Sequence, residues 1–138
     1  MAAHFDSKHG TVSRPREELY MAFADMRNFV NMLPEEKKQG VTATYDTLSA
    51  SVQGFTIGVK VARREPYSYI ELRDDGAPFQ FTVGLHFDAA EEAFKTDFSI
   101  RMDAELNVMM KMMLGSRLKE AMDKLVDSLV AVTEDMKF

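Results

Sequence analysis

The chain has 138 residues, a formal net charge of −5 and no cysteine. This length predicts one domain over residues 1–138, with a core that needs no covalent staple. The lack of cysteine excludes disulfides, thiolate nucleophiles and cysteine-ligated metals. Acidic and basic residues are mixed along the chain, which disfavours nucleic acid as a partner because phosphate binding depends on clustered Lys and Arg.

The N-terminal segment predicts one strand and two helices. Residues Phe5–Val12 alternate weakly between apolar and polar, as a short strand does. Ser13 is suited to cap a helix, and Pro15 fits only the first turn of one. Residues Met26–Leu33 predict a second short helix, or a continuation of the first after a bend, which Pro34 ends. The chain start lacks the basic and apolar regions of a secretory signal, so we expect a cytoplasmic protein.

Between Val41 and Asp103 the apolar residues recur at every second position, which is typical of half-buried strands. Turn residues such as Gln53-Gly54 and Glu65-Pro66 separate the apolar stretches. Short connections join antiparallel strands, so this region predicts a meander of six strands with one apolar and one solvated face.

From about Asn107 to Thr133 the period becomes that of a helix. Gly115 lies near the start of this helix and predicts a bend or a weakened turn there. Nothing else in the chain is large enough to cover its apolar stripe, which we therefore expect to pack against the apolar face of the sheet. No stretch of the chain is long enough to span a bilayer, so we expect no membrane insertion. The stripe consists of Leu114, Leu118, Met122, Leu125, Leu129 and Val132.

Four segments carry a likeness to known proteins, namely Phe5–Ser7, Pro15–Tyr20, Asp25–Asn28 and Leu118–Leu125. With the order strand, two short helices, six strands and long helix, they resemble the SRPBCC helix-grip superfamily. This superfamily includes START lipid-transfer domains, polyketide cyclase/dehydratase-like proteins and pollen-allergen-like proteins, and the likeness is to its small bacterial stand-alone members. The resemblance implies an α+β helix-grip fold, in which a curved antiparallel sheet of about seven strands wraps around the long C-terminal helix.

The resemblance also implies a cavity between the sheet and the C-terminal helix, suited to a small hydrophobic ligand that is lipid-like or polyketide-like. Tyr45 is the preferred polar contact, because a tyrosine hydroxyl can orient a ligand in a mostly apolar site. His9 is a second polar candidate at the end of the cavity. The candidate apolar lining comprises Phe29, Val30, Leu33, Phe55, Ile57, Val59, Phe81, Val83, Phe98, Ile100, Met102, Met109, Met110, Met113 and Leu114.

The stretch Val108–Leu114 contains four methionines, whose side chains point around most of the circumference of a helix. They cannot all lie in one core stripe. One interpretation is that they are core filler beneath the opening of the sheet. The other is that they form an adaptable wall of the pocket or a surface for a partner, because methionine fits varied shapes and exposed apolar side chains otherwise favour aggregation.

No catalytic constellation is present. The three histidines do not share the spacing of metal ligands, and neither a G-x-S-x-G motif nor a Walker-type glycine loop occurs, so we expect no metal and no cofactor. The leading interpretation is a non-catalytic carrier or sensor of an apolar small molecule. Two alternatives stay open, a polyketide cyclase- or dehydratase-like enzyme and a co-chaperone-like interaction module. An apolar cavity favours the carrier or the enzyme, whereas a collapsed interior with an exposed apolar patch favours the interaction module. The sequence leaves homodimer formation open.

Overall fold

The order of elements follows the periodicity of the sequence. The computed structural model describes residues 2–32, 35–52, 55–77, 79–92 and 94–135. Its strands are β1 (Ala2–Asp6), β2 (Gly10–Val12), β3 (Val41–Ala43), β4 (Thr47–Val52), β5 (Phe55–Glu65), β6 (Tyr69–Asp74), β7 (Phe81–Ala89) and β8 (Thr96–Glu105). Its helices are α1 (Arg16–Ala24), α2 (Arg27–Met32), the 3-10 turn η1 (Glu35–Lys37) and α3 (Val108–Asp135).

The strands form one antiparallel sheet in the order β1-β8-β7-β6-β5-β4-β3, with β2 also paired to β8. Strands β3 to β8 are the predicted six-stranded meander. The segment Phe5–Val12, predicted as one strand, is instead divided between β1 and β2, so the described sheet has eight strands. The division occurs at Ser7, whose backbone NH donates to the Ile100 carbonyl and whose Oγ accepts from the Ile100 NH, both at 2.8 Å.

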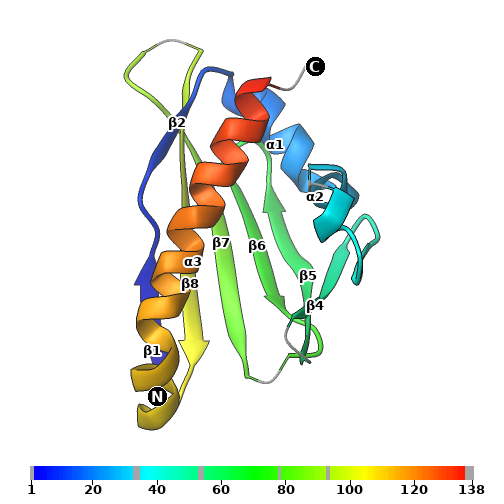
Figure 1. The fold of residues 1–138 in the computed structure, drawn as a ribbon. Helices are drawn as coiled ribbons and strands as arrows, with labels where there is room; N and C mark the ends of the chain where they lie inside the picture. Colours follow the sequence, from blue (N-terminus) through cyan, green and yellow to red (C-terminus); the bar gives the residue numbers. More distant parts are fainter. Residues whose placement is uncertain (1, 33–34, 53–54, 78, 93, 136–138) are drawn as a thin grey trace.

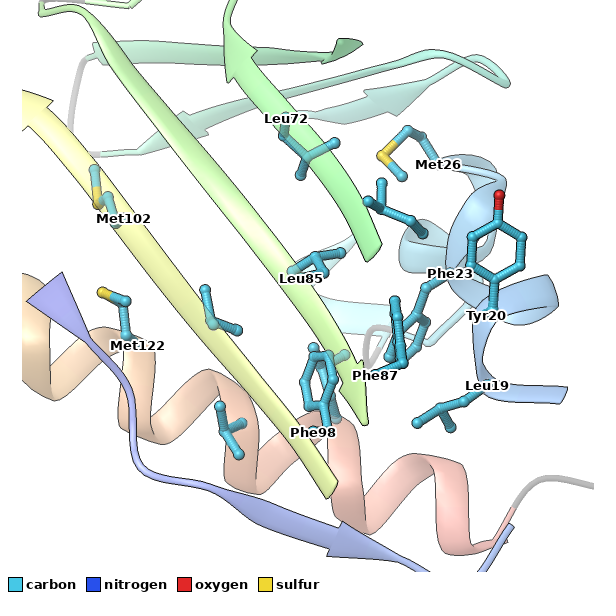
Figure 2. Close-up of a cluster of buried hydrophobic side chains, with 14 of the residues drawn as sticks. Leu19, Tyr20, Phe23, Met26, Leu72, Leu85, Phe87, Phe98, Met102 and Met122 are labelled. Atoms are coloured by element: carbon cyan, nitrogen blue, oxygen red, sulfur yellow. The ribbon is translucent and has the colours of Figure 1, made fainter. Parts of the chain in front are cut away.

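Helix α3 lies over one side of the sheet, where it packs against β1, β2 and β8 (Figure 1). Helix α1 packs against β7, and α2 packs against β3. Aromatic side chains from α1 and from the inner face of the sheet meet in the core (Figure 2). Phe23 lies 5.7 Å from Phe87 and 5.5 Å from Phe98 between ring centroids, and Phe87 lies 5.4 Å from Phe98.

The buried stripe of α3 differs from the predicted one at Leu125, while Leu114 and Leu118 are half-buried and the side chain of Val132 lies outside the described residues. Met122, Val126, Leu129 and Thr133 are buried at helical spacing, whereas Leu125 is 45% exposed. The prediction that Leu125 lies in the buried stripe was therefore wrong, because Val126, one residue along, takes that place. The helix continues through Gly115 without a break, and the ring of Phe5 lies close to this glycine.

The start of α1 also differs from the sequence-based prediction. Pro15, rather than Ser13, is the N-cap residue, and its own side chain makes no capping hydrogen bond. The Pro15 carbonyl accepts hydrogen bonds from the backbone NH groups of Glu18 and Leu19, at 3.1 and 3.3 Å. Glu17 and Glu18 lie in the first turn, where the helix dipole favours negative charge.

Candidate functional site

The inner face of the sheet is only partly covered by helices. Leu48 of β4 pairs with Val59 of β5, and Val83 of β7 pairs with the buried residues Leu72 and Met102. Part of the surface stays accessible on the four side chains that pack against this core from outside it, namely Leu48, Ile57, Val59 and Val83. Half-buried aliphatic residues therefore line the concave face beside the part that α3 covers.

One flank of α3 faces this open part of the sheet. On the opposite flank, the Asp123 carboxylate accepts a hydrogen bond from the Lys8 backbone NH at 2.6 Å, which fixes that flank to the segment between β1 and β2. With 3.6 residues per turn, Leu114, Leu118 and Leu125 lie roughly opposite Asp123. They therefore point toward the strands that α3 leaves open. From strand register and helical geometry we infer that these leucines face the half-buried residues of the sheet, and we call the set Leu48, Ile57, Val59, Val83, Leu114, Leu118 and Leu125 the concave groove.

The structure divides the predicted apolar lining into groups of different depth. Phe81, Phe98, Ile100 and Met102 are buried in the core, and each is at most 7% exposed. Ile57, Val59, Val83 and Leu114 belong to the concave groove, while Phe29, Val30 and Met110 are also half-buried. Met109 and Met113 are 71% and 65% exposed, so the structure places them at the surface. Leu33 and the side chain of Phe55 lie outside the described residues.

Tyr45 lies at a polar corner beside α1 and α2. Its ring is 47% exposed and lies under the Arg64 guanidinium, 4.2 Å from the ring centroid. Arg64 donates hydrogen bonds to the carbonyls of Ala24 and Tyr45 at 2.7 and 3.0 Å, and to the Asp46 carboxylate at 2.8 Å. Arg64 thereby ties the end of α1 and the turn between β3 and β4 to strand β5.

Arg64 was not singled out from the sequence, because a register shift between Val61 and Arg63 changes which side chains of β5 face inward. In the sequence, the only local indication of this role is the pair Arg63-Arg64, which follows a stretch of alternating apolar and polar residues. Nearby, Arg27 donates hydrogen bonds to the Asp25 carboxylate and so lowers the pKa of that group, to which the charge of Arg64 also contributes.

Replacing Arg64 with methionine should lower the free energy of unfolding by about 2–3 kcal/mol, because the carbonyls of Ala24 and Tyr45 lose the hydrogen bonds that the charged guanidinium donates. Arg63→Met is the matched control, since the Arg63 side chain is 56% exposed, lies 3.6 Å from the Glu65 carboxylate and sits 5.1 Å from the centroid of the Tyr69 ring. That control should cost less than about 1 kcal/mol. Urea denaturation followed by circular dichroism measures both, and equal losses would contradict the assigned role of Arg64.

The histidines lie on the outer face of the sheet. His4 is held between the carboxylates of Asp103 and Asp6 at 2.8 and 2.9 Å, and the hydrogen bond to Asp103 is the main reason why its pKa is raised. His9 contacts Asp97 at 3.0 Å, so the structure places it away from the concave groove. Burial lowers the pKa of His86. Within the described ranges, no three His, Cys, Asp or Glu side chains are grouped so as to hold a metal ion.

Two shallow depressions are lined mainly by charged and polar side chains. One, of about 460 Å³, contains Lys60, Arg73, Thr82 and Asp103, which lie side by side on β5, β6, β7 and β8. The other, of about 420 Å³, lies beside His86. Because apolar ligands favour apolar linings, neither depression suits the ligand class that the sequence predicts. None of the helices over the described part of the chain is long and apolar enough to cross a membrane.

No family model matches the chain, and no curated protein resembles it significantly in sequence. Solved structures do resemble it in fold. Norcoclaurine synthase from Thalictrum flavum, which has the Bet v1/SRPBCC fold, matches with a TM-score of 0.75 and 6% identity, over 99% of this chain and 88% of that chain. The protein XoxI from Bacillus cereus matches with a TM-score of 0.70 and 13% identity, over 96% of each chain.

The Aha1 dimer from Colwellia psychrerythraea, solved in solution, matches with a TM-score of 0.64 and 12% identity, over 99% of each chain. At such identities the likeness concerns the fold alone. The antiparallel sheet of this chain and its long C-terminal helix match the helix-grip α+β fold. The chain therefore has the α+β helix-grip fold of the SRPBCC superfamily, which its sequence resembles.

Proposed function

We propose that the protein binds a small apolar molecule, lipid-like or polyketide-like, in the concave groove and releases it unchanged. The observation that carries this proposal is the row of half-buried aliphatic side chains on β4, β5 and β7, opposite the leucines of α3. Where accessible apolar surface is contiguous, it is uncommon on soluble proteins and often marks a binding groove.

The side chains of the concave groove favour a carrier over an enzyme. The residues that define it are aliphatic, and the carboxylate of Asp74, the cross-strand partner of Val59, accepts a hydrogen bond from the Phe81 backbone NH at 3.0 Å. Acid–base catalysis requires a group placed to exchange a proton with the substrate, whereas a carrier needs only the apolar surface. Tyr45, the preferred polar candidate, is a neighbour of Arg64 at one end of the inner face, where it suits orientation of a ligand. The structural neighbour norcoclaurine synthase was solved with dopamine and hydroxybenzaldehyde, so this fold accommodates small molecules in that protein.

The test is a titration with Nile red, an uncharged dye whose fluorescence reports an apolar environment. The double variant Val59→Thr/Val83→Thr keeps the branched shape at both positions but places hydroxyl groups in the groove. Because each hydroxyl must lose water when the dye binds, we expect the affinity to fall by about tenfold.

Thr82→Val is the matched control, because Thr82 is the neighbour of Val83 in sequence but lies on the outer face. It should leave dye affinity unchanged. The proposal would be abandoned if the wild-type protein binds no dye, or if the double variant binds it as tightly as the wild type while keeping its circular dichroism spectrum.

A further inference from the structure

The first turns of α3 expose an apolar surface that the concave groove does not use. Val108, Met109, Met112 and Met113 are 64%, 71%, 80% and 65% exposed. At 100° per residue these four side chains fall within an arc of about 140° on the helix. We call them the methionine arc. Met110, which lies outside this arc, is half-buried against the core.

Positive charge borders the methionine arc on both sides. From the same helical geometry, Lys111 lies about 60° beyond Val108, and Arg117 lies about 40° beyond Met113. Both side chains are exposed, and neither has an ion-pair partner in the part of the chain that the structure describes. The stretch Leu106–Lys119 contains no carboxylate, although the whole chain carries a net charge of −5.

The nearest acidic residues on the helix are already engaged. Lys119 contacts the Asp123 carboxylate at 3.0 Å, and Lys124 contacts Glu120 at 3.6 Å. The start of α3 also lies at one tip of the molecule, beyond the end of β8 (Figure 1). The methionine arc and its two cations are therefore open to a broad surface.

We propose that the methionine arc docks on an anionic lipid surface. The apolar side chains enter the boundary between headgroups and acyl chains, and Lys111 and Arg117 remain at the level of the phosphates. An apolar helix face bordered by cations binds anionic membranes in this way, and long basic side chains keep their charge in the polar layer while their stems lie in apolar surroundings. The arc covers about two turns, so the helix lies at the surface without crossing the bilayer.

The charges favour a lipid surface over a second copy of the chain. Two methionine arcs facing one another would bring two pairs of unpartnered cations together, and like charges across an interface are unfavourable. Unbranched methionines also adapt readily to the irregular packing of acyl chains. Docking by the arc does not depend on the content of the concave groove, so the two proposals can fail separately.

The test is flotation of the full chain with vesicles made from equal parts of phosphatidylcholine and phosphatidylglycerol. We expect the wild type to float with these vesicles, and to do so at least about tenfold more weakly with pure phosphatidylcholine. Met109→Gln/Met113→Gln should weaken binding about tenfold or more, and Lys111→Glu/Arg117→Glu should do the same through charge.

Two controls match these variants. Met21→Gln changes a methionine that is 64% exposed on α1, and Lys60→Glu/Arg73→Glu reverses two cations on the outer face of the sheet. Both should float like the wild type. The groove variant Val59→Thr/Val83→Thr should also float like the wild type, whatever its dye affinity.

Several results would overturn the proposal. One is a wild-type protein that does not float with the anionic vesicles, and another is a Met109→Gln/Met113→Gln variant that floats as well as the wild type. A third comes from light scattering: a dimer that this variant converts to a monomer would show that a second copy, rather than lipid, covers the arc.

Discussion

Replacing Phe98 with alanine is expected to lower the free energy of unfolding by about 3–5 kcal/mol, because it leaves a cavity where a large ring was fully buried. Phe98 is 1% exposed, and its ring contacts those of Phe23 and Phe87 (Figure 2). These three rings join α1 to β7 and β8. Urea denaturation followed by circular dichroism provides the measurement. The change in the free energy of unfolding is calculated from the shift of the urea midpoint, provided that the dependence on urea concentration is the same in both proteins.

Phe94→Ala is the control for this variant. Phe94 lies in the turn between β7 and β8, and its side chain is 80% exposed, so its removal should change the free energy of unfolding by no more than about 0.5 kcal/mol. Since both variants remove the same ring, the difference between them isolates burial. A loss below about 1 kcal/mol for Phe98→Ala would contradict the packing of α1 on the sheet.

The sequence predicted the type and order of nearly every element, because apolar periodicity is a local property. The sequence was less successful in predicting which residues of α3 are buried. Leu125 and Val126 are adjacent and both apolar, so periodicity alone does not decide which of them faces the sheet. The contact between Asp123 and the Lys8 backbone helps to fix the rotation of the helix, and this contact joins residues far apart in sequence.

The candidate site was predicted in part for a similar reason. Alternation along β7 and β8 showed which residues share a face, and Phe81, Val83, Phe98 and Ile100 all belong to the inner one. Alternation does not show where helices cover that face. Phe98 and Ile100 are buried, whereas Val83 remains partly accessible.

The local sequence pattern also does not predict which side chains are exposed at the surface. The four methionines of Val108–Leu114 were recognised as too many for one stripe, but their exposure depends on where the sheet ends relative to α3. His9 was expected at the end of a cavity on the assumption of one continuous strand. The break at Ser7 separates β1 from β2, and His9 contacts Asp97 on the outer face.

Replacing Gly58 with alanine is expected to lower the free energy of unfolding by about 3 kcal/mol or more, through a clash with backbone rather than with a flexible side chain. A Cβ at this position would lie 3.1 Å from the carbonyl carbon of Asp75 and closer still to its oxygen. The same backbone is held there by two hydrogen bonds. The Gly58 NH donates to the Gly76 carbonyl at 3.1 Å, and the Asp75 NH donates to the Gly58 carbonyl at 2.8 Å.

Gly76→Ala separates this clash from conformational strain in the same turn. Gly76 has a φ of 85°, and a Cβ there would meet no atom within 4 Å, so the cost should be only the roughly 1–2 kcal/mol of a left-handed residue. Because Gly58 lies between Ile57 and Val59, the shift of β5 that Gly58→Ala forces should also weaken Nile red binding, whereas Gly76→Ala should preserve it. Equal losses of stability with unchanged dye binding in both variants would show that β5 and the turn after β6 are not in close contact.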